Sequence, residues 1–334
     1  MNIFKPEVFQ GNMSNMNYFE GWYFKQVSKN LDVVYSFIPG VSLNPERPHA
    51  FIQVINGITG ETQYVEYPLS SFSYDKKKLW VKIADSVFTR DSIDLYIDSP
   101  LIHLSGQLYF SNAIDYPKTI FSPGIMGWYS FVPFMECKHG VVSVSHQIEG
   151  SLKINELNID FTNGKGYIEK DWGRSFPESW IWLQSNHFQH SDACIMISIA
   201  KIPWIGSHFS GFLAFLYLDG KFYKFSTYNN SKITALSYKN QTVHIELKNK
   251  EYKLVVNAYL KNSGILMAPI AGKMNRRIKE SVDSEIEITL TDSKGNYEYK
   301  DKAVRTGLEV IDGIFDIVKI PISQIKSINE IDSK

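Results

Sequence analysis

The chain has 334 residues, and its 35 Lys and Arg residues balance 35 Asp and Glu residues, so the formal net charge is zero. A balanced charge gives no overall attraction to nucleic acid or to an acidic partner, and we expect neither. The hydrophobic content of 44% supports a real core and excludes a disordered chain, and the length allows two domains.

Location and metal content can also be predicted from simple patterns. The first residues lack the basic region and apolar run of a secretory signal, and no apolar run approaches the roughly 20 residues that span a bilayer. The two cysteines, Cys137 and Cys194, are far apart and have no zinc-binding spacing, which is typical of a reducing compartment. We therefore expect a cytoplasmic protein without a metal site.

The first half of the chain shows the pattern of antiparallel β-structure. Helical periodicity is almost absent, whereas short alternating runs bounded by Gly, Asn, Asp and Pro recur, so we predict an all-β protein. The 21 Phe, 19 Tyr and 7 Trp residues favour the same structure. The expected strands are 18–27, 33–40, 49–57, 61–67, 78–84, 92–98, 101–110, 128–135, 140–150 and 157–169.

A second series of strands follows a turn-forming stretch, residues 174–177, which we interpret as a domain junction. The expected strands are 179–187, 193–202, 209–218, 221–228, 232–238, 242–248, 251–260, 284–292 and 296–302. Two series of similar size predict two antiparallel β-barrel domains, residues 1–175 and 176–334.

One segment of the second half, the loop 264–281, interrupts the β pattern. An apolar run beginning at Ile265 leads into the basic residues Lys273, Arg276, Arg277 and Lys279. An apolar run followed by basic residues is typical of a segment that binds a membrane surface. We therefore expect peripheral membrane contact through the segment from Ile265 to Lys279. The alternative is a hairpin packed over a barrel mouth with its cations in solvent.

Ionisable residues are densest between Gly164 and Gly173. If this stretch is a strand, Tyr167, Glu169 and Asp171 share one face, and Ile168, Lys170 and Trp172 share the other. Two carboxylates on one face can serve proton transfer at a site where domains meet. The alternative is a solvated strand end whose charges pair with Lys165 and Lys170.

Two further residues are candidate proton donors. Glu20 shares a strand face with Tyr18, Trp22 and Phe24, and burial among rings would keep its carboxyl group protonated. The alternative is an exposed or ion-paired edge residue. His146 follows two valines on one face and can point into a cavity, or be a hydrogen-bonded core histidine. Phosphate-loop, dinucleotide, serine-hydrolase and zinc-helix motifs are absent from the sequence.

Five segments, in order, give the chain a resemblance to a known family. They are Phe19–Lys25, the stretch from Phe121 to Pro133, Gly166–Gly173, Trp180–Asn186 and Leu266–Pro269, and together they resemble the tocopherol cyclase family. The resemblance implies two lipocalin-like β-barrels, related to the calycin-type cyclases and hydratases that act on isoprenoids.

The resemblance also implies a reaction, the closing of a chromanol ring on a prenylated hydroquinone by an intramolecular lyase or isomerase without a cofactor. An acid protonates the alkene and the phenol oxygen traps the tertiary cation, which needs a dry pocket and aromatic faces. The candidate proton donors are Glu20, His146, Glu169 and Asp171. The expected substrate-binding residues are Trp22, Tyr23, Tyr167, Trp172, Trp180, Trp182 and Asn186.

Two non-catalytic functions stay open from the sequence. The first is a carrier that holds a hydrophobic small molecule in one barrel, since such folds often only bind. The second is a carbohydrate-binding protein that uses surface rings, which requires Trp22 and Trp180 to be exposed.

Overall fold

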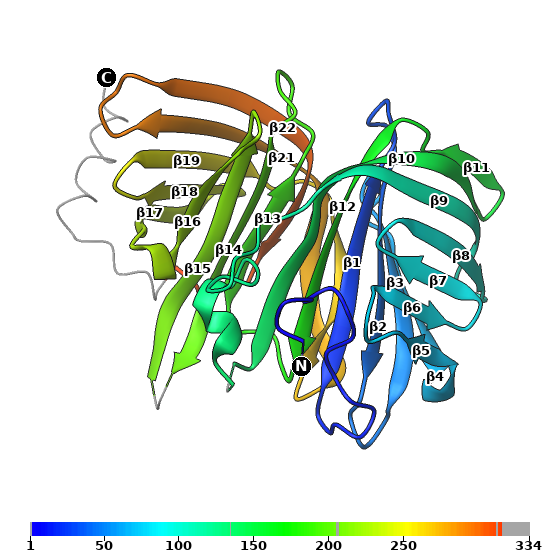
Figure 1. Ribbon diagram of the computed structural model, residues 1–334. Helices are drawn as coiled ribbons and strands as arrows, with labels where there is room; N and C mark the ends of the chain where they lie inside the picture. Colours follow the sequence, from blue (N-terminus) through cyan, green and yellow to red (C-terminus); the bar gives the residue numbers. More distant parts are fainter. Residues whose placement is uncertain (1, 134, 205–206, 312, 316–334) are drawn as a thin grey trace. The chain divides into compact units, whose positions relative to one another are not determined.

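The computed structural model describes residues 2–133, 135–204, 207–311 and 313–315 (Figure 1). Within this part the protein consists of 22 strands and three short 3-10 helices, and all strand pairs are antiparallel. The prediction of an all-β protein is therefore confirmed. A search of the described residues finds no helix that is long and apolar enough to cross a membrane.

The chain divides into two compact units. The first comprises Met1–Pro177 and Asn262–Asp283, and the second comprises Glu178–Lys261 and the chain from Ser284 onward. The predicted junction at 175 and 176 lies close to Pro177. The segment Asn262–Asp283 differs from the prediction, because it returns to the first unit. Residues 316–334 of the predicted second domain lie outside the described residues.

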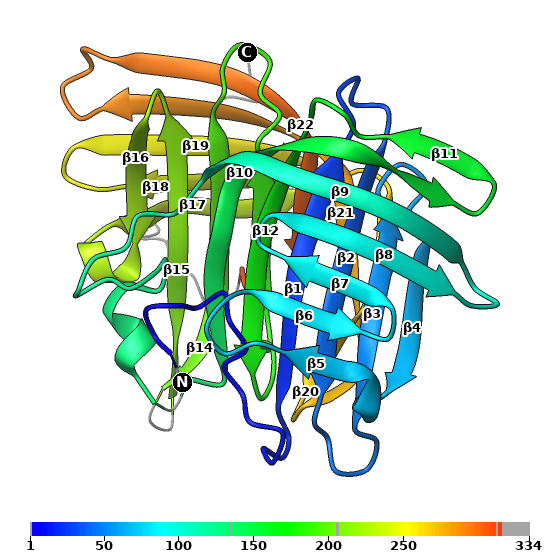
Figure 2. The same cartoon turned by 45° about the vertical axis from the view of Figure 1, so that its right-hand side comes forward.

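The sheet of the first unit has twelve strands. Their order is β4 (Thr62–Pro68), β3 (His49–Asn56), β2 (Val34–Ser42), β1 (Phe19–Val27), β12 (Gly164–Gly173), β10 (Cys137–Ile154), β9 (His103–Ile114), β8 (Ser92–Asp98), β7 (Ser86–Thr89), β6 (Trp80–Ile83) and β5 (Phe72–Tyr74), with β11 (Leu157–Asp160) beside β10. Figure 2 shows the sheet curled so that β6–β8 pass over β1–β3. Phe24 of β1 and Phe88 of β7 lie 5.4 Å apart in one core, as expected for a lipocalin-like barrel.

The sheet of the second unit is built in the same way from its own strands. The order is β16 (Lys221–Ser226), β15 (Ser207–Leu218), β14 (Cys194–Trp204), β13 (Trp180–Ser185), β22 (Glu298–Val310), β21 (Lys273–Asp292), β19 (Tyr252–Tyr259), β18 (Thr242–Lys248) and β17 (Lys232–Lys239). Alternate residues such as Ile181 and Leu183 enter a separate apolar core. The prediction of two lipocalin-like antiparallel domains is thus confirmed.

Three expected elements take a different form. The expected strand 128–135 contains the 3-10 helix η2 (Gly127–Phe131), because Gly127 has a φ of +56° and starts a tight turn; residue 134 lies outside the described residues. The expected strand 157–169 is two strands, β11 and β12, because Asn163 turns the chain with a φ of +61°.

The loop 264–281 does not interrupt the β pattern, contrary to prediction, and is a hairpin as the alternative described. It forms the hairpin of β20 (Ser263–Ile270) and the first part of β21, and Gly272 makes the turn with a φ of +74°. Leu266 and Ala268 are buried on one face of β20, so the apolar run alternates after all. The Gln53 side chain on β3 bonds both backbone groups of Met267, at 2.8 and 3.0 Å, and fastens the hairpin within the first unit.

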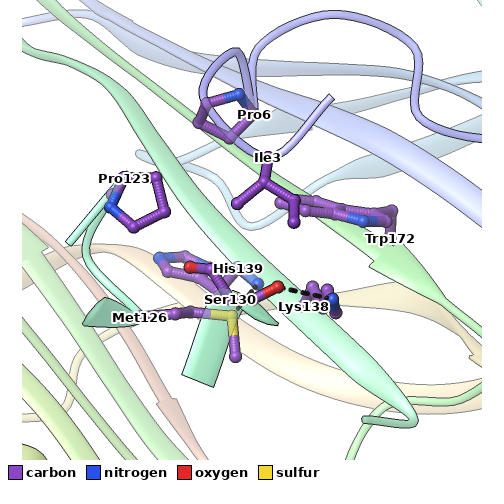
Figure 3. A pocket seen from close by; sticks show the side chains of 9 residues that line it. Ile3, Pro6, Pro123, Met126, Ser130, Lys138, His139 and Trp172 are labelled. Carbon is purple, nitrogen blue, oxygen red and sulfur yellow. Dashed lines mark hydrogen bonds between the residues drawn. The ribbon is translucent and has the colours of Figure 1, made fainter. Parts of the chain in front are cut away.

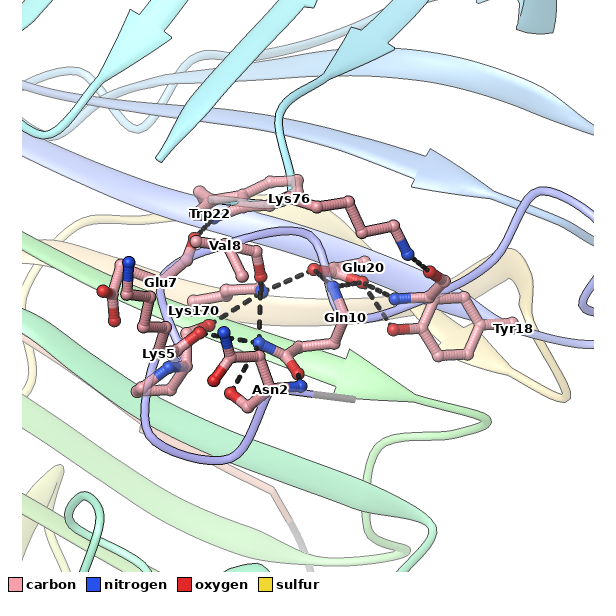
Figure 4. Close-up of polar contacts among 12 residues, drawn as sticks. Asn2, Lys5, Glu7, Val8, Gln10, Tyr18, Glu20, Trp22, Lys76 and Lys170 are labelled. Carbon is pink, nitrogen blue, oxygen red and sulfur yellow. Dashed lines mark hydrogen bonds and ion pairs between the residues drawn. The ribbon is translucent and has the colours of Figure 1, made fainter. Parts of the chain in front are cut away.

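Inside the first unit, a buried ion pair ties the N-terminal segment to the sheet (Figure 4). Glu20 of β1 and Lys170 of β12 form a salt bridge with neither side chain exposed. The Lys170 ammonium also donates to the carbonyl oxygens of Pro6 and Val8. The backbone of Gln10 donates to Glu20, so both charges are fully partnered.

We expect Glu20→Gln to lower the free energy of unfolding by about 3–5 kcal/mol, because it leaves the buried Lys170 charge uncompensated. The measurement is urea unfolding of the full chain followed by fluorescence. Glu66→Gln is the matched control, since its exposed pair with Arg47 contributes less than about 1 kcal/mol. Equal effects of the two substitutions would contradict the importance of the buried pair.

Candidate active site

The candidate site lies on three neighbouring strands of the first unit, β1, β12 and β10. Their register pairs His139 with Asp171 and Tyr23 with Glu169. Side chains alternate along β12, so Tyr167, Glu169 and Asp171 share one face as predicted, and the Tyr167 hydroxyl donates to Glu169 Oε2 at 2.6 Å. The opposite face carries Lys170 into the barrel. The expected pairing of the two carboxylates with Lys170 is therefore wrong.

His139 stands between the two carboxylates. Its Nδ1 lies 3.0 Å from Asp171 Oδ1, and its Nε2 lies 3.5 Å from Glu169 Oε2. No hydrogen bond to Nε2 forms among the described residues. The Glu169 side chain is 6% exposed, His139 is 13% exposed and Asp171 is 26% exposed, so the cluster opens at its His139 and Asp171 end.

The electrostatics of this cluster favour a protonated imidazole. Burial alone would lower the pKa of His139, but the charges of Asp171 and Glu169 and the hydrogen bond to Asp171 outweigh it and raise the pKa to about 9. Burial and the same Asp171 carboxylate raise the pKa of the Cys137 thiol, which therefore stays protonated. With a pKa of about 9, the imidazole of His139 is protonated at neutral pH.

Two tyrosines extend the polar cluster along the same face of the sheet. The Tyr23 hydroxyl donates to Glu280 Oε1 at 2.6 Å and accepts from Ser36 Oγ at 2.9 Å. Burial, followed by the charge of Glu280, raises the pKa of Tyr23 well above its usual range. Burial, followed by the charge of Glu169, also raises the pKa of Tyr167. Both phenols therefore stay protonated and donate hydrogen bonds that orient the carboxylates.

The cluster also has the donor set of a cation site. His139, Glu169 and Asp171 each offer one ligand atom, and these atoms lie within 4.8 Å of one another. Nitrogen and carboxylate ligands suit zinc or iron. In the structure the His139 nitrogen and the Asp171 oxygen bond each other, so a metal ion would have to replace the imidazole proton.

A small pocket borders His139 (Figure 3). Its walls come from the N-terminal segment, from the loop before β10 and from β10 and β12, and include Pro6, Pro123, Met126 and Trp172. The Lys138 ammonium closes one side by donating to the carbonyl of Ser130 at 2.9 Å. The cavity volume of about 10 Å³ is room for about one water molecule.

Two predicted proton donors lie apart from this cluster. Glu20 is ion-paired inside the barrel, so the prediction of a protonated acid among rings is wrong, and the alternative of an ion-paired residue holds. His146 packs on Phe110 with ring centroids 4.2 Å apart, and its Nδ1 meets Ser143 Oγ at 3.0 Å. Burial, followed by the charge of Arg90, lowers its pKa to about 3, so its ring is neutral. It is the core histidine that the alternative described.

The predicted substrate-binding residues fall into three groups. Trp22 and Trp172 are buried, and each ring lies 4.8 Å from the Lys170 ammonium, whereas Tyr23 and Tyr167 border the His139 cluster. In the second unit Trp180, Trp182 and Asn186 are buried. With Trp22 and Trp180 both buried, the carbohydrate-binding hypothesis is wrong.

Sequence reasoning missed His139 and Glu280. The expected strand started at residue 140, one position after His139, and no spacing links His139 to Asp171, 32 residues later. Glu280 directly follows the basic residues of the hairpin, and its hydrogen-bond partner Tyr23 lies 257 residues away in the sequence. Only the pairing of distant strands brings these residues together.

The sequence and the fold can be compared with those of known proteins. A family model described as tocopherol cyclase-like matches residues 114–311, which is more than half of the chain. The chain belongs to the tocopherol cyclase-like family. The matched region contains β10 and β12, and therefore His139, Glu169 and Asp171.

Sequence relatives include chloroplast proteins of two cereals. A protein of Oryza sativa subsp. japonica described as "Probable tocopherol cyclase, chloroplastic" is 26% identical over 157 residues, 42% of this chain and 33% of the relative. The Zea mays tocopherol cyclase is 28% identical over 103 residues, 30% of this chain and 22% of the relative. This chain thus spans a third or less of the curated relatives that it matches.

A solved structure shares the fold over most of the chain. The crystal structure of CghA with Sch210972 superposes with a TM-score of 0.55 at 11% identity and covers 89% of each chain. At that identity the likeness concerns the fold alone.

We expect the imidazole of His139 to titrate near pH 9 in nuclear magnetic resonance spectra, assigned with a His139→Gln variant. Asp171→Asn should move the midpoint to lower pH, because it removes the carboxylate that raises the pKa most. A midpoint near the ordinary value of about 6.5 in the unchanged protein would contradict the ion-paired cluster.

The same shift predicts a pH-dependent stability. Because the pKa of His139 is raised on folding, its contribution of about 3 kcal/mol is fully present below about pH 6.5 and is lost as the pH rises through 9. The unfolding free energies of the unchanged protein and His139→Gln should therefore converge above pH 9. A constant difference across this window would exclude the linkage.

Proposed function

We propose that this protein is an enzyme that closes a ring on a prenylated phenol or hydroquinone by acid-initiated cyclisation. The observation that carries the proposal is the position of the His139 side chain, 13% exposed, between Glu169 and Asp171 in a chain of the tocopherol cyclase-like family. The substrate in this proposal is a hydrophobic small molecule, which the family membership supports.

In the proposed reaction, the His139 imidazolium gives its proton to the less substituted carbon of the prenyl alkene. The bond from nitrogen to hydrogen breaks, a bond from carbon to hydrogen forms, and the tertiary carbon becomes a cation. The carboxylates of Glu169 and Asp171, no longer balanced by the imidazolium, then stabilise this cation. This stabilisation of the cation offsets the free-energy cost of deprotonating His139, whose pKa is raised.

The phenol oxygen attacks the tertiary carbon and closes the ring, and the phenol proton returns to the neutral imidazole. Substrate and product are therefore isomers, and the cluster ends in the state in which it began. Tyr167 is a positioning residue in this scheme, because its hydroxyl holds the Glu169 carboxylate at 2.6 Å.

The carrier function is the second candidate. It requires space for a ligand in one barrel, whereas core side chains such as Trp22, Phe24, Phe37 and Phe88 fill the interior of the first unit and are fully buried. This packing argues against a carrier that would use the first barrel.

We expect His139→Gln to slow the cyclisation of prenylated hydroquinones at least 100-fold, because it removes the proton donor. Asp171→Asn should also slow it, and the measurement is chromatography of the products with mass spectrometry. His103→Gln is the matched control, since His103 forms a similar pair with Asp98 at 2.6 Å but is exposed.

Three outcomes would contradict the proposal. If the unchanged protein retains these compounds without converting them, it is a carrier. If His139→Gln keeps full activity, another group supplies the proton. If chelators abolish activity and an added divalent metal restores it, the cluster binds a metal rather than donating a proton.

A further inference from the structure

A tight turn in the first unit presents two large apolar side chains to solvent. Thr119 and Ser122 bond each other's backbone at 2.8 and 3.1 Å, which fixes the turn between them. Ile120 and Phe121 stand at its tip and are 75% and 84% exposed. Exposed apolar residues on a preformed turn cost solvation free energy unless something covers them.

Further exposed rings lie in the same part of the first unit. Trp128 and Phe131 of η2 are 48% and 46% exposed, and Phe4 is 50% exposed. The rings of Phe4 and Phe131 lie 6.4 Å apart, and Lys118, one residue before the turn, donates to the Phe4 carbonyl at 3.5 Å. We call Phe4, Ile120, Phe121, Trp128 and Phe131 the aromatic patch.

Exposed lysines border the aromatic patch. Lys5 follows Phe4 in the chain and donates to the carbonyl of Lys77 at 2.8 Å, and Lys118 donates to the Phe4 carbonyl. The acidic neighbour Glu7 pairs with Lys118 at 3.1 Å. Asp75 also lies here and accepts from the Lys77 backbone at 2.6 Å, so three lysines face two carboxylates and the border keeps a positive excess.

We propose that the aromatic patch binds the surface of a lipid bilayer that contains anionic lipids. Exposed Trp and Phe side chains suit the boundary between headgroups and acyl chains, and a cationic border complements anionic headgroups. A second copy of this chain fits less well, because a two-fold contact would bring the same lysines together.

The patch is continuous with the pocket beside His139. Pro123, Met126 and Ser130 come from the segment that carries the turn and η2, and they form one wall of that pocket (Figure 3). A hydrophobic molecule dissolved in a bilayer would thus meet the patch next to this pocket. The binding itself does not depend on the proposed reaction.

The test is co-sedimentation of the full chain with vesicles of phosphatidylcholine, with and without phosphatidylglycerol, in the absence of substrate. The unchanged protein should bind the anionic vesicles more tightly. Ile120→Ser with Phe121→Ser should weaken binding at least tenfold, because two apolar side chains no longer enter the bilayer. Lys5→Glu with Lys118→Glu should weaken binding to the anionic vesicles only.

Two double variants serve as controls. Leu101→Ser with Leu157→Ser removes apolar side chains of similar exposure, 57% and 69%, and should leave binding unchanged. Ile265→Ser with Ile270→Ser removes the exposed side chains of the β20 hairpin, which the sequence predicted as the membrane contact. Circular dichroism melting checks that each variant folds.

Three results would overturn the proposal. The unchanged protein could fail to sediment with either kind of vesicle. The hairpin variant could lose binding while the turn variant keeps it, which would assign the contact to residues 265–279. Light scattering could show a dimer that only the turn variant dissociates, with vesicle binding unaffected, which would assign the patch to a second copy.

Discussion

The buried ion pair of Glu20 and Lys170 sets the register on which the first unit depends. Lys170 reaches into the barrel, where Glu20 and the carbonyl oxygens of the N-terminal segment surround its ammonium. An uncompensated charge at that depth would be costly, so β12 cannot slip by one residue without leaving both charges unpaired. Because side chains alternate, the same register holds Glu169 and Asp171 on the opposite face, beside His139.

The two faces of β12 therefore carry charges with different tasks. Inside the barrel, cation and anion are balanced and closed off from solvent, and their effect is structural. On the other face, one imidazolium stands between two carboxylates and reaches partial exposure. The proposed reaction uses this imbalance, because loss of the imidazole proton would leave two carboxylates to stabilise a cation.

The fold tolerates very different sequences. CghA has the same fold at 11% identity, so the arrangement of strands tolerates nearly complete replacement of the side chains. What a member of such a fold does depends on the groups that its strands present. In this chain those groups lie within the region that matches the tocopherol cyclase-like family, and the pairing of β10 with β12 brings them together.

Alternation along a strand is a local property, so the sequence by itself determined the all-β class, most strand positions and the shared face of Tyr167, Glu169 and Asp171. It could not determine partners across strands. Glu20 was expected as an acid because its partner Lys170 lies 150 residues away, and His139 was missed because its nearest anions are on another strand. The η2 helix and the return of Asn262–Asp283 to the first unit likewise depend on long-range contacts. Only the tertiary structure decided these points, because burial and pairing between distant segments set the charge state of each group.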